Sequence, residues 1–253
     1  MLAQTFGLCH SAPGKQKIFP RSLLLSYESF DIMRQLQRRE SMNDESSVPD
    51  FSSLTPLTKD KLNKFVNCAA NGFLGYSHSD WSMGGNASEE KLRRFWNAIL
   101  LSQTKKTHIL ADSPDVRGIL IASKTADSGT KTLSFLMNGG LKFFSCIPRL
   151  LSYESYAGKI RSKHAGKDTW YIFTLVVEKA SQGKHVATSL MSPLLSYLDR
   201  VGADCYLETH DKKNVPIYEH FGFALVETGT VPHSKLTHYA MLRKPKTSET
   251  KTR

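Results

Sequence analysis

Six residues in the C-terminal part of the chain have the types and spacing of a phosphate-binding turn. They run Gln182-Gly183-Lys184-His185-Val186-Ala187, after an apolar run from Trp170 to Val177 and before an apolar-periodic segment that reaches Val201. This order predicts a strand, a tight turn and a helix. Such a turn directs successive backbone N–H groups and the positive end of a helix dipole at one point, as a pyrophosphate requires. The sequence therefore predicts a cofactor that carries phosphate groups.

The sequence around this turn predicts an α/β (mixed) domain. Apolar periodicities give the element order β-α-α-β-β-α-β-α-β-α-β-β over about residues 50 to 243. In the helix after the turn, apolar residues four apart are expected to face the sheet. They are Val186, Leu190, Leu194 and Leu198. A Gly-rich loop is expected from Asn71 to Ala87.

The ends of the chain differ from this middle part. Residues 1–41 hold no acidic residue before Glu28 and are expected to be a disordered or leader-like extension. Residues 244–253 are polar and are expected to form a disordered tail. Residues 42–243 would then form one domain, with a helical insertion over about 133–163 that is interrupted at Gly139-Gly140 and Pro148.

Composition narrows the class of protein and leaves its partner open. The 253 residues, 40% of them hydrophobic, are enough for one core. The net charge of +11 suggests an anionic partner such as a nucleotide cofactor, or only a solvated basic face. The four cysteines lie far apart, which predicts no metal site and no disulfide framework. Because no apolar run is long enough to span a bilayer, we expect a cytoplasmic protein with no membrane partner, unless residues 1–41 are an organelle leader.

From Trp170 onward the chain resembles the GNAT superfamily of acyl-CoA-dependent N-acyltransferases, most closely its puromycin-acetyltransferase-like members. Three stretches carry the resemblance: Trp170–Val177, the Gln182–Ala187 turn, and Tyr206–Thr209 followed by Asn214–Phe223. It implies a mostly antiparallel central sheet with a splayed central strand, flanked by helices. It also implies an acetyl-CoA-dependent N-acetyltransferase that transfers directly in a ternary complex.

One residue departs from the family pattern, because His185 stands where these turns usually have Gly. Gly permits unusual backbone angles and a close approach of the phosphate. His185 could therefore loosen the turn. Alternatively, it keeps ordinary helical angles and its imidazole faces solvent or a phosphate.

The resemblance also implies which residues bind the cofactor. Main-chain groups near the end of the splayed strand would be free for the pantetheine arm, and an N–H near Val177 could polarise the thioester carbonyl. Asn214 would hydrogen-bond the cofactor and Tyr218 would protonate the departing thiolate, although a helix cap and a packing residue are the plainer interpretations. The implied cofactor-binding set is Leu175, Val176, Val177, Gln182, Gly183, Lys184, His185, Val186, Ala187, Asn214 and Tyr218.

An amine must lose a proton before it can accept an acyl group, so a general base is needed. Glu208, at the end of the strand beside the splayed one, is the first candidate because partial burial would raise its pKa. Glu178 and His210 are the next candidates, and Glu208 could instead be a surface or ion-paired carboxylate.

The acceptor site is expected near Tyr76, Asp80 and Trp81, and the insertion could form one wall of it. Five insertion cations would disfavour a cationic acceptor unless they face outward: Lys142, Arg149, Lys159, Arg161 and Lys163.

Two other functions stay open at this point. The basic charge could serve a nucleic-acid-binding protein, but no helix-turn-helix, zinc-finger or ribonucleoprotein motif is recognised, so no nucleic acid is expected. A GNAT fold that binds acyl-CoA without catalysis is the other, because of His185. The sequence leaves open whether the acceptor is a small-molecule amine or a protein amino group, and whether the protein is a monomer or a dimer.

Overall fold

The computed structural model describes residues 48–85 and 87–246. The predicted extension (1–41) and most of the predicted tail (244–253) therefore lie outside the described residues. The described chain forms a seven-stranded sheet in the order β1-β2-β3-β4-β5-β7-β6. The strands are β1 (Thr55–Pro56), β2 (His108–Ala111), β3 (Gly118–Lys124), β4 (Trp170–Val177), β5 (Cys205–Thr209), β6 (Ala224–Thr230) and β7 (Thr237–Arg243).

The mixed α/β fold and the mostly antiparallel sheet are confirmed. Neighbouring strands of the described chain pair antiparallel except β4 and β5, which are parallel. Parallel neighbours need a crossover connection, and here it is helix α7 (Val186–Val201). The predicted apolar stripe of α7 is also confirmed, because Val186, Leu190, Leu194 and Leu198 are all buried.

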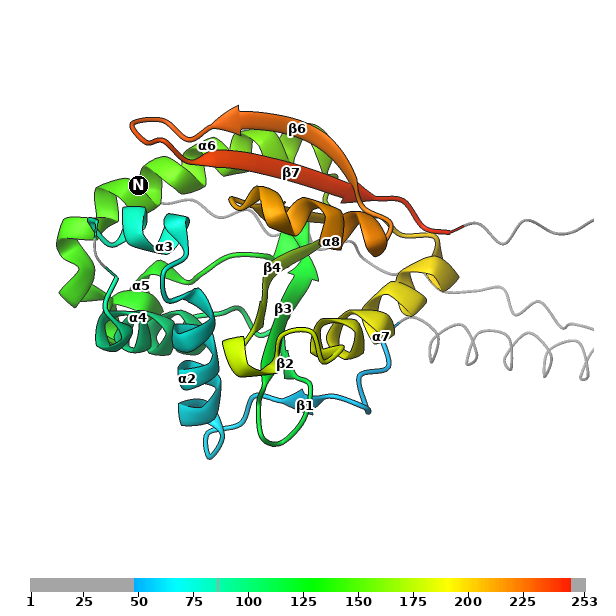
Figure 1. Ribbon diagram of the computed structural model, residues 1–253, viewed down its shortest axis with the longest axis horizontal. Coiled ribbons are helices and arrows are strands. Elements are labelled where there is room, and N and C mark those ends of the chain that lie inside the picture. The colour runs from blue at the N-terminus through cyan, green and yellow to red at the C-terminus, as the bar shows by residue number, and fades with distance from the viewer. Residues whose placement is uncertain (1–47, 86, 247–253) are drawn as a thin grey trace, which may run out of the picture. The chain divides into compact units, whose positions relative to one another are not determined.

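Two hydrophobic layers cover the central strands. Because side chains alternate along β3, Ile119 and Ile121 join a core with helices α2 (Leu62–Phe73) and α4 (Glu89–Leu101). Leu120 and Ala122 point the other way, into a core with α7. Figure 1 shows α2 and α4 on one side of β2, β3 and β4 and α7 on the other. The end of β4 is therefore held from both faces.

Strand β4 is splayed from β5, as predicted. The two strands pair only from Trp170↔Cys205 to Ile172↔Leu207. On its other edge, β4 stays paired with β3 as far as Val177↔Gly118. The last residues of β4 therefore have no partner strand on the β5 side, which leaves main-chain groups open along that edge.

The expectation of a continuous loop from Asn71 to Ala87 is wrong. Helix α2 continues to Phe73, and a short helix α3 occupies Ser77–Ser82. The local sequence carries little helical signal, but the Ser82 hydroxyl bonds the His78 carbonyl oxygen at 2.6 Å and the Asp80 carboxylate accepts the Ala87 N–H at 3.2 Å. The glycines with positive φ lie between the helices and after them: Gly75 between α2 and α3, and Gly84 and Gly85 after α3.

The insertion between β3 and β4 is helical. It contains α5 (Thr132–Met137), a 3-10 segment η2 (Gly140–Cys146) and α6 (Ile147–His164). Gly139, with a φ of 103°, separates α5 from η2, and Pro148 lies in the first turn of α6. The two ends of the insertion lie side by side, since Lys124 pairs with Trp170 and the Thr125 N–H donates to the Thr169 carbonyl oxygen at 2.8 Å.

Two helical glycines allow a matched test of how closely α2 approaches β4. A Cβ on Gly72 would lie 2.2 Å from Val176 Cγ2, whereas one on Gly158 in α6 would meet nothing closer than 3.9 Å. We expect Gly72→Ala to destabilise the protein by about 1–3 kcal/mol, because a methyl there overpacks the core. Gly158→Ala should stabilise it by about 0.5–1 kcal/mol through helix propensity. Urea unfolding of both variants checks this, and equal shifts would contradict the close contact.

Candidate functional site

The turn between β4 and α7 is tied to the end of the strand by side-chain hydrogen bonds. The Gln182 side-chain amide donates to the Val177 carbonyl oxygen at 3.2 Å. The Ser181 hydroxyl donates to the Glu178 carboxylate at 2.7 Å, across the short segment η3 (Lys179–Ser181). Glu178 therefore braces the turn at the end of β4.

His185 adopts the left-handed conformation that Gly would adopt. Its φ is 59° and its ψ is 15°, and Gly183 also has a positive φ, of 77°. The alternative in which His185 keeps ordinary helical angles is therefore wrong. Its neighbour Val186 is buried and packs where Gly118 leaves room, since a Cβ there would lie 2.6 Å from Val186 Cγ1. This packing holds the turn despite the cost of a left-handed non-glycine residue, about 1 kcal/mol or more.

The start of α7 suits an anionic group. No side chain caps the helix at His185, so its first backbone N–H groups have no side-chain acceptor. Gln182, Gly183, Lys184 and His185 are all exposed, and nothing lies within 4 Å of a Cβ added to Gly183. Together with the dipole of a 16-residue helix, these free donors fit a diphosphate.

The open edge of β4 lies directly before this turn. Val176 packs toward α2 and α4, whereas Leu175 and Val177 pack against the α7 core. Their main-chain groups on the β5 side lie beyond the last rung of β4–β5 pairing. Ala187, in the first turn of α7, is half-buried. The implied cofactor-binding residues of β4 and α7 thus form one continuous segment from Leu175 to Ala187.

Asn214 and Tyr218 lie across the splay, after β5. Asn214 ends a 3-10 turn, η4 (Lys212–Asn214), and its amide donates to the Thr209 hydroxyl at 3.0 Å. Tyr218, in α8 (Val215–His220), is 9% exposed, with its ring 6.1 Å edge-on from Phe223. Burial raises the pKa of the Tyr218 phenol, so it stays protonated at neutral pH. The same burial makes Tyr218 a weaker acid than a free phenol, so its role as proton donor stays a prediction.

Glu208 is buried at the end of β5 among three partners. Its side chain is 4% exposed, and its two oxygens lie 3.2 Å from Arg161 Nη1 and from the Tyr153 hydroxyl. The Tyr171 hydroxyl also donates to it, at 3.3 Å. Burial raises the pKa of the carboxyl to about 7, although Arg161 pulls it down. Glu208 is therefore ion-paired, and its raised pKa is compatible with a base, a role that stays a prediction.

Arg161 corrects part of the expectation for the insertion. It is 8% exposed, pairs with both Glu208 and Glu154, and lies 4.4 Å over the ring of Tyr171. Its charge is therefore neutralised inside the protein. It does not make a cationic acceptor unfavourable, as a free cation would.

Three histidines that are distant in sequence gather beside Tyr153. The ring centroids of His78 and His210 lie 4.5 Å apart, those of His210 and His238 5.5 Å, and those of His78 and Tyr153 4.4 Å. Burial lowers the pKa of His78 and of His238 to about 4 and that of His210 to about 2. Buried ring nitrogens of all three lack a hydrogen-bond partner. The cluster is therefore uncharged at neutral pH and offers polar atoms without partners.

The residues expected near the acceptor divide into two groups. The Tyr76 hydroxyl accepts the His210 N–H at 2.9 Å and lies 3.4 Å from His210 Nδ1 and from the Thr209 hydroxyl. Tyr76 thus joins the histidine cluster to the neighbourhood of Asn214. Trp81 lies next to His78, with ring centroids 6.3 Å apart. Asp80 instead holds the loop after α3, and Glu178 lies in the turn, where it bonds Ser181 rather than the cluster.

Sequence reasoning missed four residues of this site, His78, Tyr153, Tyr171 and His238, and named Arg161 only as a cation of the insertion. One signal was available for α6, where Tyr153, Ala157, Ile160 and Arg161 follow helical spacing on one face. His78 and His238 carry no such pattern, because each is a single polar residue in a short or exposed-looking segment. In the described residues, no group of three or more His, Cys, Asp or Glu side chains could hold a metal ion, and no helix there is long and apolar enough to cross a membrane.

Comparison with known proteins gives a family match over part of the chain. A model of the acetyltransferase (GNAT) family matches residues 141–223, about a third of the chain. An uncharacterized N-acetyltransferase of Schizosaccharomyces pombe (strain 972 / ATCC 24843) is 32% identical over 125 residues, covering 47% of this chain and 49% of the relative. The match thus spans about half the length of that relative.

A solved structure with a TM-score above 0.5 supports the fold. The C-terminal condensation domain of Ebony, in complex with beta-alanyl-dopamine, has a TM-score of 0.51 at 10% identity, covering 76% of this chain and 97% of that one. A Corynebacterium glutamicum protein described as histone acetyltransferase HPA2 and related acetyltransferase has a TM-score of 0.49 at 18% identity, covering 78% and 98%. The GNAT family model thus matches part of the chain, and the Ebony domain supports the fold. The closer likeness to puromycin-acetyltransferase-like members stays a prediction.

Proposed function

We propose that the protein is an acetyl-CoA-dependent N-acetyltransferase that moves the acetyl group to a primary amine by direct transfer in a ternary complex. The observation that carries the proposal is the parting of β4 from β5 immediately before an uncapped helix start. Main-chain groups of Leu175 and Val177 would hold the pantetheine arm, and the Gln182–Ala187 turn would hold the diphosphate. Acetyl-CoA supplies the thioester when it is bound.

Side chains on the β5 side of the splay would accept and donate the protons of the reaction. Glu208, with a carboxyl pKa of about 7, would accept the proton that the amine must lose. Tyr218, protonated at neutral pH, would donate to the leaving thiolate, and Asn214 would orient the cofactor while it bonds Thr209. The acceptor amine would approach from the side of Tyr76 and the three histidines, because Tyr153 contacts both His78 and Glu208. A small-molecule amine and a protein amino group both fit this description.

Direct transfer is favoured over a cysteine-bound intermediate. The cysteines of the described residues, Cys68, Cys146 and Cys205, are all buried. Burial raises the pKa of the Cys68 thiol to about 12 and raises that of Cys205 further. Because the thiolate is the nucleophile, Cys68 and Cys205 are unsuited to carry an acyl group at neutral pH.

Tyr218→Phe tests the proton donor. A positioned general acid contributes about 10²-fold or more, so we expect kcat to fall about 10²-fold while the Kd for acetyl-CoA stays unchanged. The measurement is thiol release with a library of amines, combined with calorimetry of acetyl-CoA binding. Unchanged turnover would remove Tyr218 from the mechanism.

The matched control is Tyr239→Phe, which removes a phenol from a half-buried position in β7 and should leave kcat unchanged. The proposal as a whole has a separate test. If acetyl-CoA does not raise the melting temperature of the wild-type protein and no amine releases thiol, the assignment of acetyl transfer fails, whatever the variant does.

A further inference from the structure

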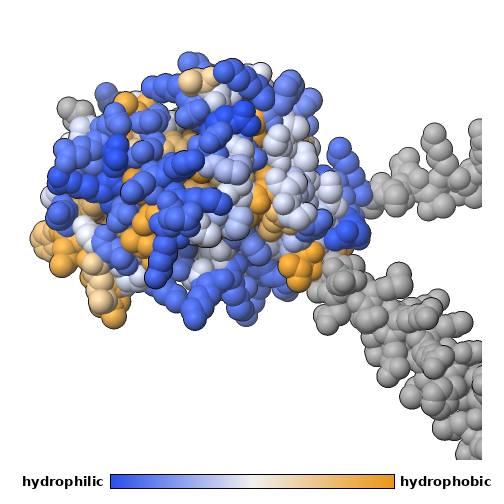
Figure 2. Space-filling model, turned by 90° about the horizontal axis from the view of Figure 1, so that it is seen from below, coloured by the Kyte–Doolittle hydropathy of each residue, from blue (hydrophilic) through white to orange (hydrophobic). Residues whose placement is uncertain are grey.

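The insertion has an inner face that packs on the core and an outer face that carries large apolar side chains. Phe135, Phe143 and Cys146 are buried against α4 and its neighbours. Close to them in sequence, four apolar residues are strongly exposed: Leu133 (71%), Met137 (79%), Leu141 (65%) and Phe144 (76%). We call these four residues the outer apolar patch. Figure 2 shows hydrophobic residues bordered by hydrophilic ones on the side of the molecule where α4 and α5 lie in Figure 1.

The spacing of the patch explains why its members protrude together. Leu133 and Met137 are four apart in α5, so they share a face of that helix. Leu141 and Phe144 are three apart in η2, on either side of a kink at Phe143, and both side chains are exposed. Two short elements therefore each present a pair of apolar side chains to the outside.

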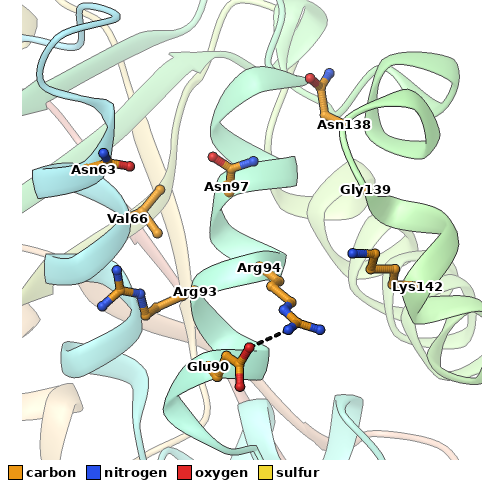
Figure 3. Close-up of a pocket in the computed structure, with 9 residues that line it drawn as sticks. All are labelled: Asn63, Val66, Glu90, Arg93, Arg94, Asn97, Asn138, Gly139 and Lys142. Carbon is orange, nitrogen blue, oxygen red and sulfur yellow. Dashed lines mark hydrogen bonds and ion pairs between the residues drawn. The ribbon is translucent and has the colours of Figure 1, made fainter.

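A cationic hollow adjoins the patch. It has a volume of about 370 Å³ and lies between α2, α4 and the insertion. Figure 3 shows Arg94 and Lys142 reaching into the space between α4 and the insertion. The hollow is lined by the cations Arg93, Arg94 and Lys142, the amides Asn63, Asn97 and Asn138, and also Val66, Glu90 and Gly139.

The charge of the hollow is only partly neutralised from within. Arg94 pairs with Glu90, but among the ion pairs of the described residues none involves Arg93 or Lys142. The hollow and the patch also share one stretch of chain, because Asn138, Gly139 and Lys142 alternate with Met137, Leu141 and Phe144. A partner that contacts this stretch therefore touches cationic and apolar side chains together.

We propose that this surface docks the protein on an anionic lipid bilayer, with lipid phosphate groups in the hollow and the outer apolar patch at the boundary between headgroups and acyl chains. Flanking cations and protruding Leu, Met and Phe side chains are what such a boundary accommodates. A nucleic acid would use the cations but would leave the four apolar side chains in water. The prediction of no membrane partner was drawn from the lack of a spanning run, and surface docking needs none.

Vesicle sedimentation with the full chain tests the proposal. Phosphatidylcholine vesicles are compared with vesicles that contain 30% phosphatidylserine. We expect binding to the anionic vesicles to be at least about tenfold stronger, because each cation near such a surface contributes to attraction. The difference should shrink as salt rises from low to physiological ionic strength. Equal binding to both vesicles, or binding to neither, would overturn the proposal.

Paired variants separate the two halves of the surface. Leu141→Asp with Phe144→Asp alters the patch, and Arg93→Glu with Lys142→Glu alters the hollow. Each pair should weaken anionic-vesicle binding about tenfold or more. Leu225→Asp on β6 and Lys235→Glu in the β6–β7 loop change exposed residues elsewhere and should leave binding unchanged. If the control variants lose as much binding as the test variants, the surface is misassigned.

A last measurement distinguishes a lipid headgroup from a free phosphate ligand in the hollow. Soluble glycerophosphate and inorganic phosphate are added to the protein in a thermal-shift experiment without vesicles. Stabilisation by these anions, without vesicle binding, would mean that the hollow holds a free phosphate ligand and would overturn membrane docking. Vesicle binding that persists in millimolar phosphate supports it, since the patch then contributes beyond the hollow.

Discussion

Replacing Glu208 by Gln is expected to lower kcat/KM for the acceptor amine by about 10³-fold at pH 7. The amide keeps the size of the carboxyl and its contacts with the Tyr153 and Tyr171 hydroxyls, but it cannot accept a proton. In the wild type, kcat/KM should fall as pH drops below the Glu208 carboxyl pKa of about 7, because the protonated carboxyl is no longer a base. This acid limb should be absent in the variant. Initial rates between pH 5.5 and 9 measure both effects.

The control must separate catalysis from folding, because Glu208 is also the buried partner of Arg161. Removing one member of a buried pair destabilises proteins by about 3–5 kcal/mol, so unfolding is measured alongside the rates. Glu154→Gln is the matched variant, since Glu154 pairs with the same Arg161 but its side chain is exposed. It should keep the acid limb. A Glu208→Gln protein that is folded and retains the limb would show that another group takes the proton.

Acidification is expected to destabilise the protein steeply below pH 6.5, because of the three buried histidines. In the folded protein the pKa values of His78 and His238 are about 4 and that of His210 is about 2, below the value of 6.5 for an unfolded histidine. As pH falls from 6.5 toward 4, the unfolded chain therefore binds protons that the folded chain does not. Three such groups make the free energy of unfolding fall by about 4 kcal/mol per pH unit. Glu208 offsets about 1.4 kcal/mol per pH unit of this, because its raised pKa lets the folded chain bind that proton first.

Urea unfolding at pH 7, 6 and 5 measures this slope. His238→Gln should reduce it by about 1.4 kcal/mol per pH unit, because one buried titrating ring is removed. His220→Gln is the control, since that ring lies exposed at the end of α8 and its replacement should leave the slope as it is. A free energy of unfolding that does not change between pH 7 and 5 would contradict the neutral, buried state of the cluster.

The sequence predicted the parts of the site that lie within single elements. The apolar run of β4, the turn and the stripe of α7 each have a period that one stretch of chain displays by itself. The splay of β4 was predicted from the family resemblance alone, because the residue types of a buried strand do not show how far its pairing extends. Glu208 and Tyr218 could be named because they sit in recognisable segments, and both lie beside the splayed strand.

The histidine cluster and α3 could not be predicted in this way. His78, His210 and His238 come from α3, the end of β5 and the start of β7, and only the folded sheet brings these segments together. Helix α3 is held mainly by bonds such as Ser82 to His78 and Asp80 to Ala87, which propensity does not report. His185 shows the same limit, since its left-handed backbone depends on packing around Val186.

The insertion between β3 and β4 begins and ends next to two paired residues, Lys124 and Trp170, and this has a consequence for engineering. Since these two residues already face each other across an antiparallel pair, a replacement of the intervening chain is expected to keep the register of the sheet if it also fills the core positions of Phe135, Phe143 and Cys146. The replaced segment includes Tyr153 and Arg161, the neighbours of the carboxylate on β5. Under the proposed function, exchanging this segment is expected to change the preference for the amine while the proposed cofactor-binding turn stays the same.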